Sequence, residues 1–154
     1  MRYQANGFIP INEPPARLTK PAAAVAIVKG DALHDNGAGY ATNATIALDS
    51  ATFLGIAAAD CNNSAGAAGD LNVEFYPNDT KTLYRVPVAA NAVITQTIVG
   101  SWIDLEANDD VDISDTVATG QGFHVIDIDI SDEAIDANTY GYAIGHFGLV
   151  VTES

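Results

Sequence analysis

Apolar runs in this chain are short, and turn-forming residues separate them at intervals of roughly 8–12 residues. No stretch repeats its apolar residues with the period of an amphipathic helix. Thirteen glycines, with many asparagines, aspartates, serines and threonines, supply the turns that such a chain needs. At 154 residues the chain can bury a core without disulfides or metals. We therefore expect an all-β fold, a single-domain antiparallel β-sandwich or small β-barrel with an extended N-terminal arm.

The expected strands stand out by alternation of apolar and polar residues, or by runs of β-branched and aromatic residues. The pair Asn36-Gly37 predicts a hairpin turn, and one helical turn is expected over 131–138. The strands are expected at 24–29, 40–42, 52–57, 71–76, 82–88, 92–99, 101–105, 123–130 and 139–151.

Two of these strands carry signs of irregular pairing. Proline cannot donate a ladder hydrogen bond, so Pro87 places strand 82–88 at a sheet edge or at a bulge. In strand 123–130, the isoleucine row that begins at Ile126 is out of phase with Phe123 and predicts a β-bulge.

The first 21 residues differ from the rest of the chain. Four prolines forbid a helix there and favour extended backbone, so we divide the chain into an arm, 1–21, and a β-rich body, 22–154. The arm is too apolar for a simple linker. Its apolar side chains should dock on the body, on a neighbouring subunit or on a partner; they are Phe8, Ile9, Ile11 and Leu18.

Charge is also sorted along the chain. Residues 1–29 carry four basic residues and one acid, whereas residues 30–154 carry two basic residues and nineteen acids. An acidic body repels nucleic acid and anionic lipid, so neither is an expected partner. We expect the basic residues of the arm, Arg2, Arg17 and Lys20, to meet carboxylates on a partner.

No motif in the chain indicates an enzyme. There is no Gly-x-Ser-x-Gly element, no phosphate-binding glycine loop followed by lysine, and no short His or Cys spacing typical of a zinc site. We interpret His124 and His146 as packing or surface residues, Trp102 as a core residue and Cys61 as a small buried side chain. We expect neither enzymatic activity nor a cofactor.

Calcium is the one metal for which the sequence offers candidate ligands. Asp127, Asp129 and Asp132 begin like a calcium loop, with oxygen ligands at nearly alternate positions. The glycine that such a loop needs is missing, because Asp132 stands in its place. We therefore expect a solvated acidic face rather than a metal site, with these three aspartates as weak calcium candidates.

The longest apolar run near the start, 22–28, follows the prolines and is too short for a signal peptide or a membrane span. We expect a protein made in the cytoplasm and not exported by the usual route.

The order of several glycine-rich and apolar pieces over about 30–151 resembles the capsid decoration (cement) proteins of tailed bacteriophages. A Gly-Asp entry leads through a glycine-rich turn to the run Phe-Leu-Gly-Ile-Ala, and three further strands follow. The pieces are 29–33, 40–41, 53–58, 99–105, 123–129 and 140–147.

The resemblance implies an all-β structural protein on the outside of the virion. It would bind the major capsid protein, stabilise the assembled shell and form a homo-oligomer such as a trimer. We expect the arm to be the capsid-binding segment, with apolar contacts from Phe8, Ile9, Ile11 and Leu18 and charged contacts from Arg2, Arg17 and Lys20. The alternative is a carbohydrate- or host-surface-binding β module of a phage fibre or adhesin. A hydrolase with paired carboxylates, or a calcium-dependent enzyme, is the third hypothesis.

Overall fold

The computed structural model describes residues 7–43, 53–88, 94–129 and 141–148. Strands dominate this part of the chain, and its one helical element is a 3-10 turn, η2 (Gln96–Ile98). The all-β expectation is confirmed. The strands are β1 (Ile9–Pro10), β2 (Arg17–Thr19), β3 (Val25–Ile27), β4 (Ala32–Asp35), β5 (Ala41–Asn43), β6 (Phe53–Ala57), β7 (Cys61–Asn63), β8 (Val73–Pro77), β9 (Tyr84–Pro87), β10 (Trp102–Ala107), β11 (Asp110–Thr116), β12 (Phe123–Asp129) and β13 (Tyr142–Phe147).

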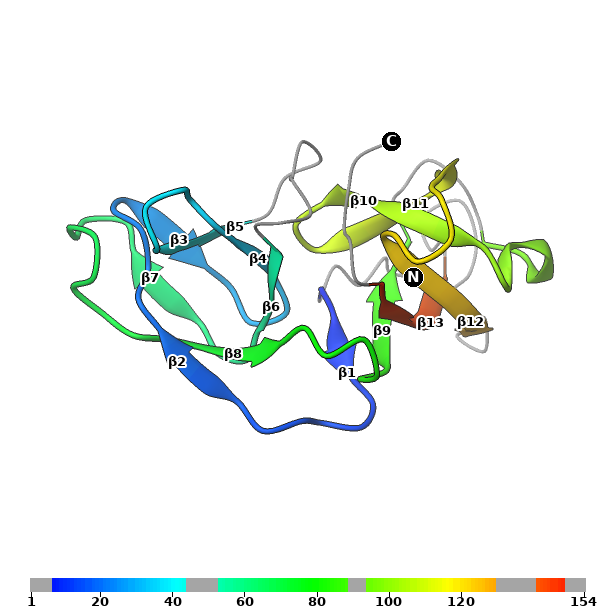
Figure 1. Cartoon of the computed structure of the whole chain (residues 1–154), viewed down its shortest axis with the longest axis horizontal. Coiled ribbons are helices and arrows are strands. Elements are labelled where there is room, and N and C mark those ends of the chain that lie inside the picture. Colours follow the sequence, from blue (N-terminus) through cyan, green and yellow to red (C-terminus); the bar gives the residue numbers. More distant parts are fainter. Residues whose placement is uncertain (1–6, 44–52, 89–93, 130–140, 149–154) are drawn as a thin grey trace.

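The strands form three antiparallel sheets, and Figure 1 shows them side by side. A six-stranded sheet has the order β1-β9-β13-β12-β10-β11, and a five-stranded sheet has the order β2-β8-β6-β4-β5. Strands β3 and β7 make a separate two-stranded ribbon. Except for β1, every strand of the six-stranded sheet comes from the second half of the chain, whereas the other two sheets come from the first half.

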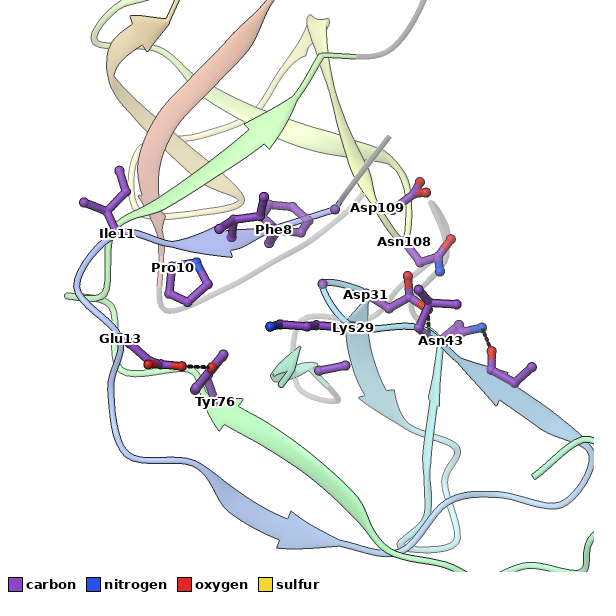
Figure 2. Close-up of a pocket in the computed structure, with 16 residues that line it drawn as sticks. Phe8, Pro10, Ile11, Glu13, Lys29, Asp31, Asn43, Tyr76, Asn108 and Asp109 are labelled. Atoms are coloured by element: carbon purple, nitrogen blue, oxygen red, sulfur yellow. Dashed lines mark hydrogen bonds between the residues drawn. The ribbon is translucent and has the colours of Figure 1, made fainter. Parts of the chain in front are cut away.

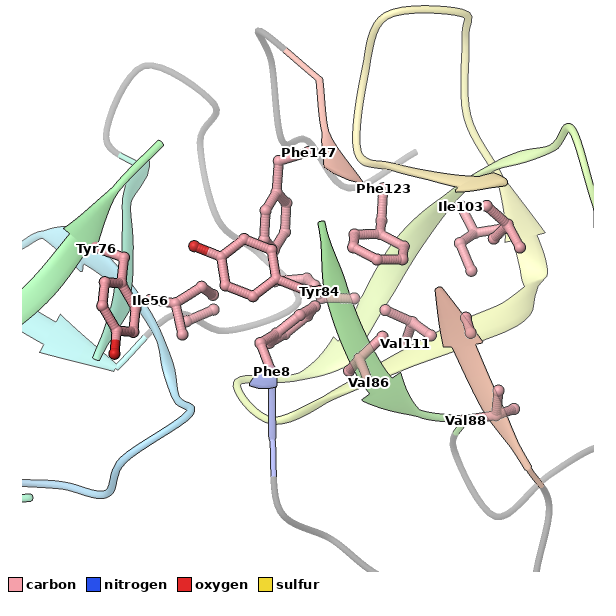
Figure 3. Packing of buried hydrophobic residues seen from close by; sticks show 14 of the residues in the cluster. Phe8, Ile56, Tyr76, Tyr84, Val86, Val88, Ile103, Val111, Phe123 and Phe147 are labelled. Carbon is pink, nitrogen blue, oxygen red and sulfur yellow. The ribbon is translucent and has the colours of Figure 1, made fainter. Parts of the chain in front are cut away.

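The five-stranded sheet buries both of its faces. In β6, Ile56 belongs to a core cluster shared with the six-stranded sheet, and the next residue, Ala57, belongs to a second cluster shared with the β3–β7 ribbon. Successive side chains of a strand point to opposite faces, so the five-stranded sheet is the middle of three layers. Figure 3 shows the larger cluster. The sheets pack as a sandwich and no closed barrel forms among the described residues.

The same double burial explains one difference from the sequence analysis. The alternation in 71–76 predicts Tyr76 on the solvent side, but its side chain is only 4% exposed and packs in the larger cluster. Phe75 packs against the second cluster instead. An alternating pattern identifies a strand with one wet face, and it misleads where both faces are covered by other layers.

The expected hairpin between β4 and β5 is confirmed, and side chains at its start hold the turn. The Asp35 carboxylate accepts hydrogen bonds from the backbone N–H of Gly37 (2.7 Å) and Gly39 (3.0 Å). The Asn36 side-chain oxygen accepts one from Ala38 (2.9 Å). Both glycines adopt positive φ angles, which glycine tolerates without strain.

The expected bulge in β12 is also confirmed, because the register with β13 shifts between Val125 and Asp127. Ile126 lies at this shift and is 41% exposed, although the isoleucine row predicted it on the buried side. Ile128, after the bulge, packs against the larger core cluster.

Two other expected strands need correction or fall partly outside the described residues. The described part of 92–99 contains the 3-10 turn η2 and no strand. Pro87 lies in β9, which is an inner strand. Among the described residues β1 pairs with Tyr84 and Arg85, and none pairs with Pro87 on that side. The helical turn expected over 131–138 lies outside the described residues.

Candidate interaction surface

The described part of the N-terminal segment, residues 7–21, contributes to two sheets. Strand β1 is an edge of the six-stranded sheet, and β2 is an edge of the five-stranded sheet. Figure 1 shows the blue chain passing from β1 to β2 along the outside of the molecule. The sequence left three docking partners open for this segment. In the structure, its strands β1 and β2 pair with strands of the chain's own body.

Phe8 anchors the segment in the core. Its backbone N–H donates to the carbonyl of Gly30 (2.8 Å), and its side chain is 1% exposed. The ring lies 4.9 Å from the ring of Phe147 and 5.7 Å from that of Phe123 (Figure 3). The sequence predicted Phe8 as a contact for a partner, but burial of its ring excludes that role in this fold.

Ile9 and Ile11 have fixed backbones and exposed side chains. Ile9 pairs with Arg85 in the sheet and is 38% exposed. Ile11 is 54% exposed, while its N–H donates to the carbonyl of Leu83 (2.7 Å). The side-chain oxygen of Asn12 accepts a hydrogen bond from the N–H of Leu83 (2.7 Å). Backbone pairing with the β9 region thus holds the two isoleucines in place, with their side chains exposed for contact with another molecule.

Leu18 is the most exposed large apolar residue of the described chain, at 66%. It lies in β2 opposite Glu74, and β2 has no strand on its outer side among the described residues. Arg17 is exposed beside it, and Lys20 donates from Nζ to the side-chain oxygen of Asn72 (2.8 Å). Arg2, the third predicted basic contact, lies outside the described residues.

A groove of about 980 Å³ runs between the N-terminal segment and the turn that joins β3 to β4. Ile9 and Ile11 line it from one side, and Val28, which is 58% exposed, lines it from the other. Figure 2 shows the groove, with the Lys29 side chain extending into it toward the N-terminal segment. An open groove with three exposed aliphatic side chains is suited to bind an apolar segment of another molecule.

The groove is acidic overall. Its lining includes one basic side chain, Lys29, and three acids, Glu13, Asp31 and Asp109. Burial raises the pKa of Asp31 to about 6, and the nearby Asp109 adds to this increase, while hydrogen bonds from the Val28 N–H and from Asn108 oppose it. A positively charged group on a partner would relieve this accumulation of negative charge.

Glu13 and Tyr76 connect the N-terminal segment to the five-stranded sheet. The Tyr76 hydroxyl donates a hydrogen bond to the Glu13 carboxylate, drawn as a dashed line in Figure 2. Burial, followed by this hydrogen bond and the charge of Glu13, raises the pKa of Tyr76 to about 12. This hydrogen bond therefore ties the N-terminal segment to β8 at the groove.

Of the three weak calcium candidates, the structure describes Asp127 and Asp129. Asp129 forms an ion pair with Arg85 (3.3 Å), and Asp127 accepts the N–H of Ile128 (2.8 Å). Asp132 lies outside the described residues. Within the described ranges, no three His, Cys, Asp or Glu side chains lie close enough to hold a metal ion together.

The cysteine, the tryptophan and two of the histidines interpreted in the sequence analysis differ in their burial and contacts. Cys61 is buried in the smaller cluster, as predicted, and burial raises its pKa. Trp102 is only partly buried and stacks on His124, so it is not the core residue expected. His124 and His146 are in contact with each other, a pairing that their separation of 22 residues gave no reason to expect.

No helix in the described part of the chain is long and apolar enough to cross a membrane.

No protein-family model matches the chain, and no curated protein sequence matches it significantly.

Proposed function

We propose that the chain is a structural decoration protein of a tailed-phage capsid, which binds the outer surface of the major capsid protein shell and stabilises it. One observation carries the proposal. Six large apolar side chains are exposed in the described chain, and four of them gather on the N-terminal segment and its groove: Ile9, Ile11, Leu18 and Val28. Three of them line the groove and Leu18 lies apart on β2, and exposed apolar groups of this kind are typical of protein-binding surfaces.

The groove suits an extended apolar segment of the capsid protein that carries a basic residue. Its aliphatic side chains would pack between Ile9, Ile11 and Val28, and its cation would lie near Asp31 and Asp109. Because β1 and the β3–β4 turn are held by backbone hydrogen bonds, the surface changes little on binding and loses little entropy.

The open edge of β2 offers a second contact of the same kind. An extended segment of a capsid subunit can add a strand there and pack beside Leu18. Two separated contacts, the groove and this edge, would let one molecule bridge neighbouring capsid subunits. Self-association into a trimer, which the resemblance implies, would multiply the weak contacts of each copy.

The chain's charge fits this role. A net charge of −14 keeps unattached copies apart in solution, and it disfavours contact with packaged nucleic acid. The arm residues Arg17 and Lys20 remain exposed at the surface, where they can meet carboxylates of a shell.

The test is co-sedimentation of the purified protein with assembled shells of the phage whose genome encodes the chain. Saturable binding to mature shells, with a higher melting temperature of the bound shells, is the expected result. Absence of binding would overturn the proposal, and binding to a glycan panel in its place would favour the carbohydrate-binding alternative. Deleting residues 1–21 is unsuitable here, because it removes Phe8 from the core.

A further inference from the structure

Trp102, His124 and His146 form a row across three strands on the surface of the six-stranded sheet. In the register, Trp102 pairs with His124 and His124 pairs with His146. The Trp102 ring stacks on the His124 ring with 4.3 Å between centroids and 6° between planes. The two imidazoles meet edge to face, with His124 Nδ1 3.2 Å from His146 Nε2. All three side chains are partly exposed, so small solutes can reach them.

A backbone carbonyl fixes the tautomer of His146. Its Nδ1 lies 3.1 Å from the carbonyl oxygen of Phe147. A carbonyl can only accept, so Nδ1 carries the hydrogen, and in the neutral ring Nε2 presents a lone pair to His124. Metal-binding histidines show this same pattern, with one ring nitrogen held by a backbone carbonyl and the other free to ligate.

His124 is suited to the same role. Its Nδ1 lies 3.2 Å from His146 Nε2, and its ring is held from the other side by stacking on Trp102. In the neutral tautomer with its hydrogen on Nε2, His124 presents the Nδ1 lone pair on the side of His146. The two facing nitrogens belong to rings set 82° apart, so both can be bound by one ion placed between them.

We propose that His124 Nδ1 and His146 Nε2 bind one divalent transition-metal ion of the class that prefers imidazole, such as Zn²⁺ or Cu²⁺, with water in the remaining positions. Metal–nitrogen bonds of about 2.0–2.1 Å across the 3.2 Å separation give an N–metal–N angle of about 100°, close to tetrahedral. The chain's net charge of −14 raises the concentration of cations near the protein. A shared proton is the competing occupant, because the same separation suits an N–H···N hydrogen bond.

The chain provides its own reporter, since Trp102 is its only tryptophan. Tryptophan fluorescence is measured while the intact protein is titrated with Cu²⁺, which quenches a ring at such short range, and then with Zn²⁺, which does not. We expect saturable quenching at one equivalent of Cu²⁺ and recovery of fluorescence when a large excess of Zn²⁺ displaces the more tightly bound Cu²⁺. Mg²⁺ and Ca²⁺, which prefer oxygen ligands, should not restore the signal.

Two variants assign the site. His146→Gln removes one ligand and leaves Trp102 stacked on His124, so the Cu²⁺ affinity should fall by at least about tenfold. His34→Gln removes the only remaining histidine, which lies in β4, and should leave the affinity unchanged. If His146→Gln fails to fold by circular dichroism, His124→Gln replaces it with the same expected loss.

Equal affinity in the wild type and in the folded His124 or His146 variant would overturn the proposal, as would quenching that does not saturate. A pH titration of fluorescence without metal tests whether the two imidazoles share a proton instead. If fluorescence changes with protonation of the pair but no Cu²⁺ or Zn²⁺ binds, the two rings hold a proton and the metal site is refuted.

Discussion

The ring of Phe8 lies 4.9 Å from the ring of Phe147, so the residue that precedes the first described strand packs directly against the last strand. Phe8 also contacts the rings of Tyr84 and Phe123. The N-terminal segment is therefore held at its buried end by an aromatic cluster, while the isoleucines that follow remain exposed. The buried Phe8 and the exposed Ile9 are thus adjacent residues of one short segment.

Replacing Phe8 by alanine should destabilise the whole fold. Removing a fully buried phenylalanine costs about 3–5 kcal/mol of unfolding free energy, through lost burial and the cavity left behind. Urea denaturation measures this cost, and Leu18→Ala serves as the control because its side chain is exposed. A loss below about 1 kcal/mol for Phe8→Ala would mean that the segment is not part of the core.

Gly7 allows the N-terminal segment to approach the β3–β4 turn. It has a φ of +70°, and an added Cβ would lie 2.5 Å from the carbonyl oxygen of Gly30. Gly37 has a φ of +92° with no atom within 4 Å of such a Cβ. Both alanine variants carry a backbone strain of about 1 kcal/mol, and only Gly7→Ala adds a steric clash of about 1–3 kcal/mol. Thermal melts should show Gly7→Ala as the less stable variant; equal melting temperatures would refute the close approach.

Asp31 should make stability depend on pH. Its pKa is about 6 in the folded protein against an ordinary value of 3.8, so the folded state binds its proton more tightly. The stability that this proton contributes is complete below about pH 4 and is lost as the pH rises through about 6.

Urea denaturation of the wild type and Asp31→Asn from pH 5 upward, away from the isoelectric point near 4.1, measures this contribution. The wild type's unfolding free energy, relative to that of the variant, should fall between about pH 5 and pH 6.5 and then stay level. A relative stability that rises over this interval would contradict the burial of Asp31.

Cys61 should be unreactive in the folded protein. The thiol is buried, and burial raises its pKa, so little thiolate is available to a disulfide reagent. Reaction with the reagent should be more than about tenfold slower in buffer than in denaturant, where the thiol is exposed. Similar rates in the two solvents would show that the β7 layer opens readily.

Local patterns predicted local structure well. The Asn36-Gly37 pair identified its hairpin, and the phase shift in strand 123–130 identified a bulge, because both depend on neighbouring residues. The strand predicted over 92–99 was wrong in its described part, where Gln96–Ile98 is a 3-10 turn. That stretch has strand-like residues, but tertiary context decides whether they pair.

The surface was harder to predict than the fold. The sequence does not distinguish the four apolar residues of the arm: Phe8, Ile9, Ile11 and Leu18. Only the placement of the segment beside β9 shows that Phe8 is buried and that the other three are exposed. The groove and the contact between His124 and His146 depend on strands distant in the sequence. Their sheet order cannot be derived from the spacing of the residues.

The central claim is that the exposed apolar side chains at the groove attach the protein to a phage shell. Co-sedimentation of Ile11→Asp with assembled shells tests it most directly, with Ile126→Asp as the matched control, since Ile126 is a similarly exposed isoleucine outside the groove. The account predicts that Ile11→Asp binds at least about tenfold more weakly than the wild type, while Ile126→Asp binds within about twofold of it. Undiminished binding of a folded Ile11→Asp protein would contradict it.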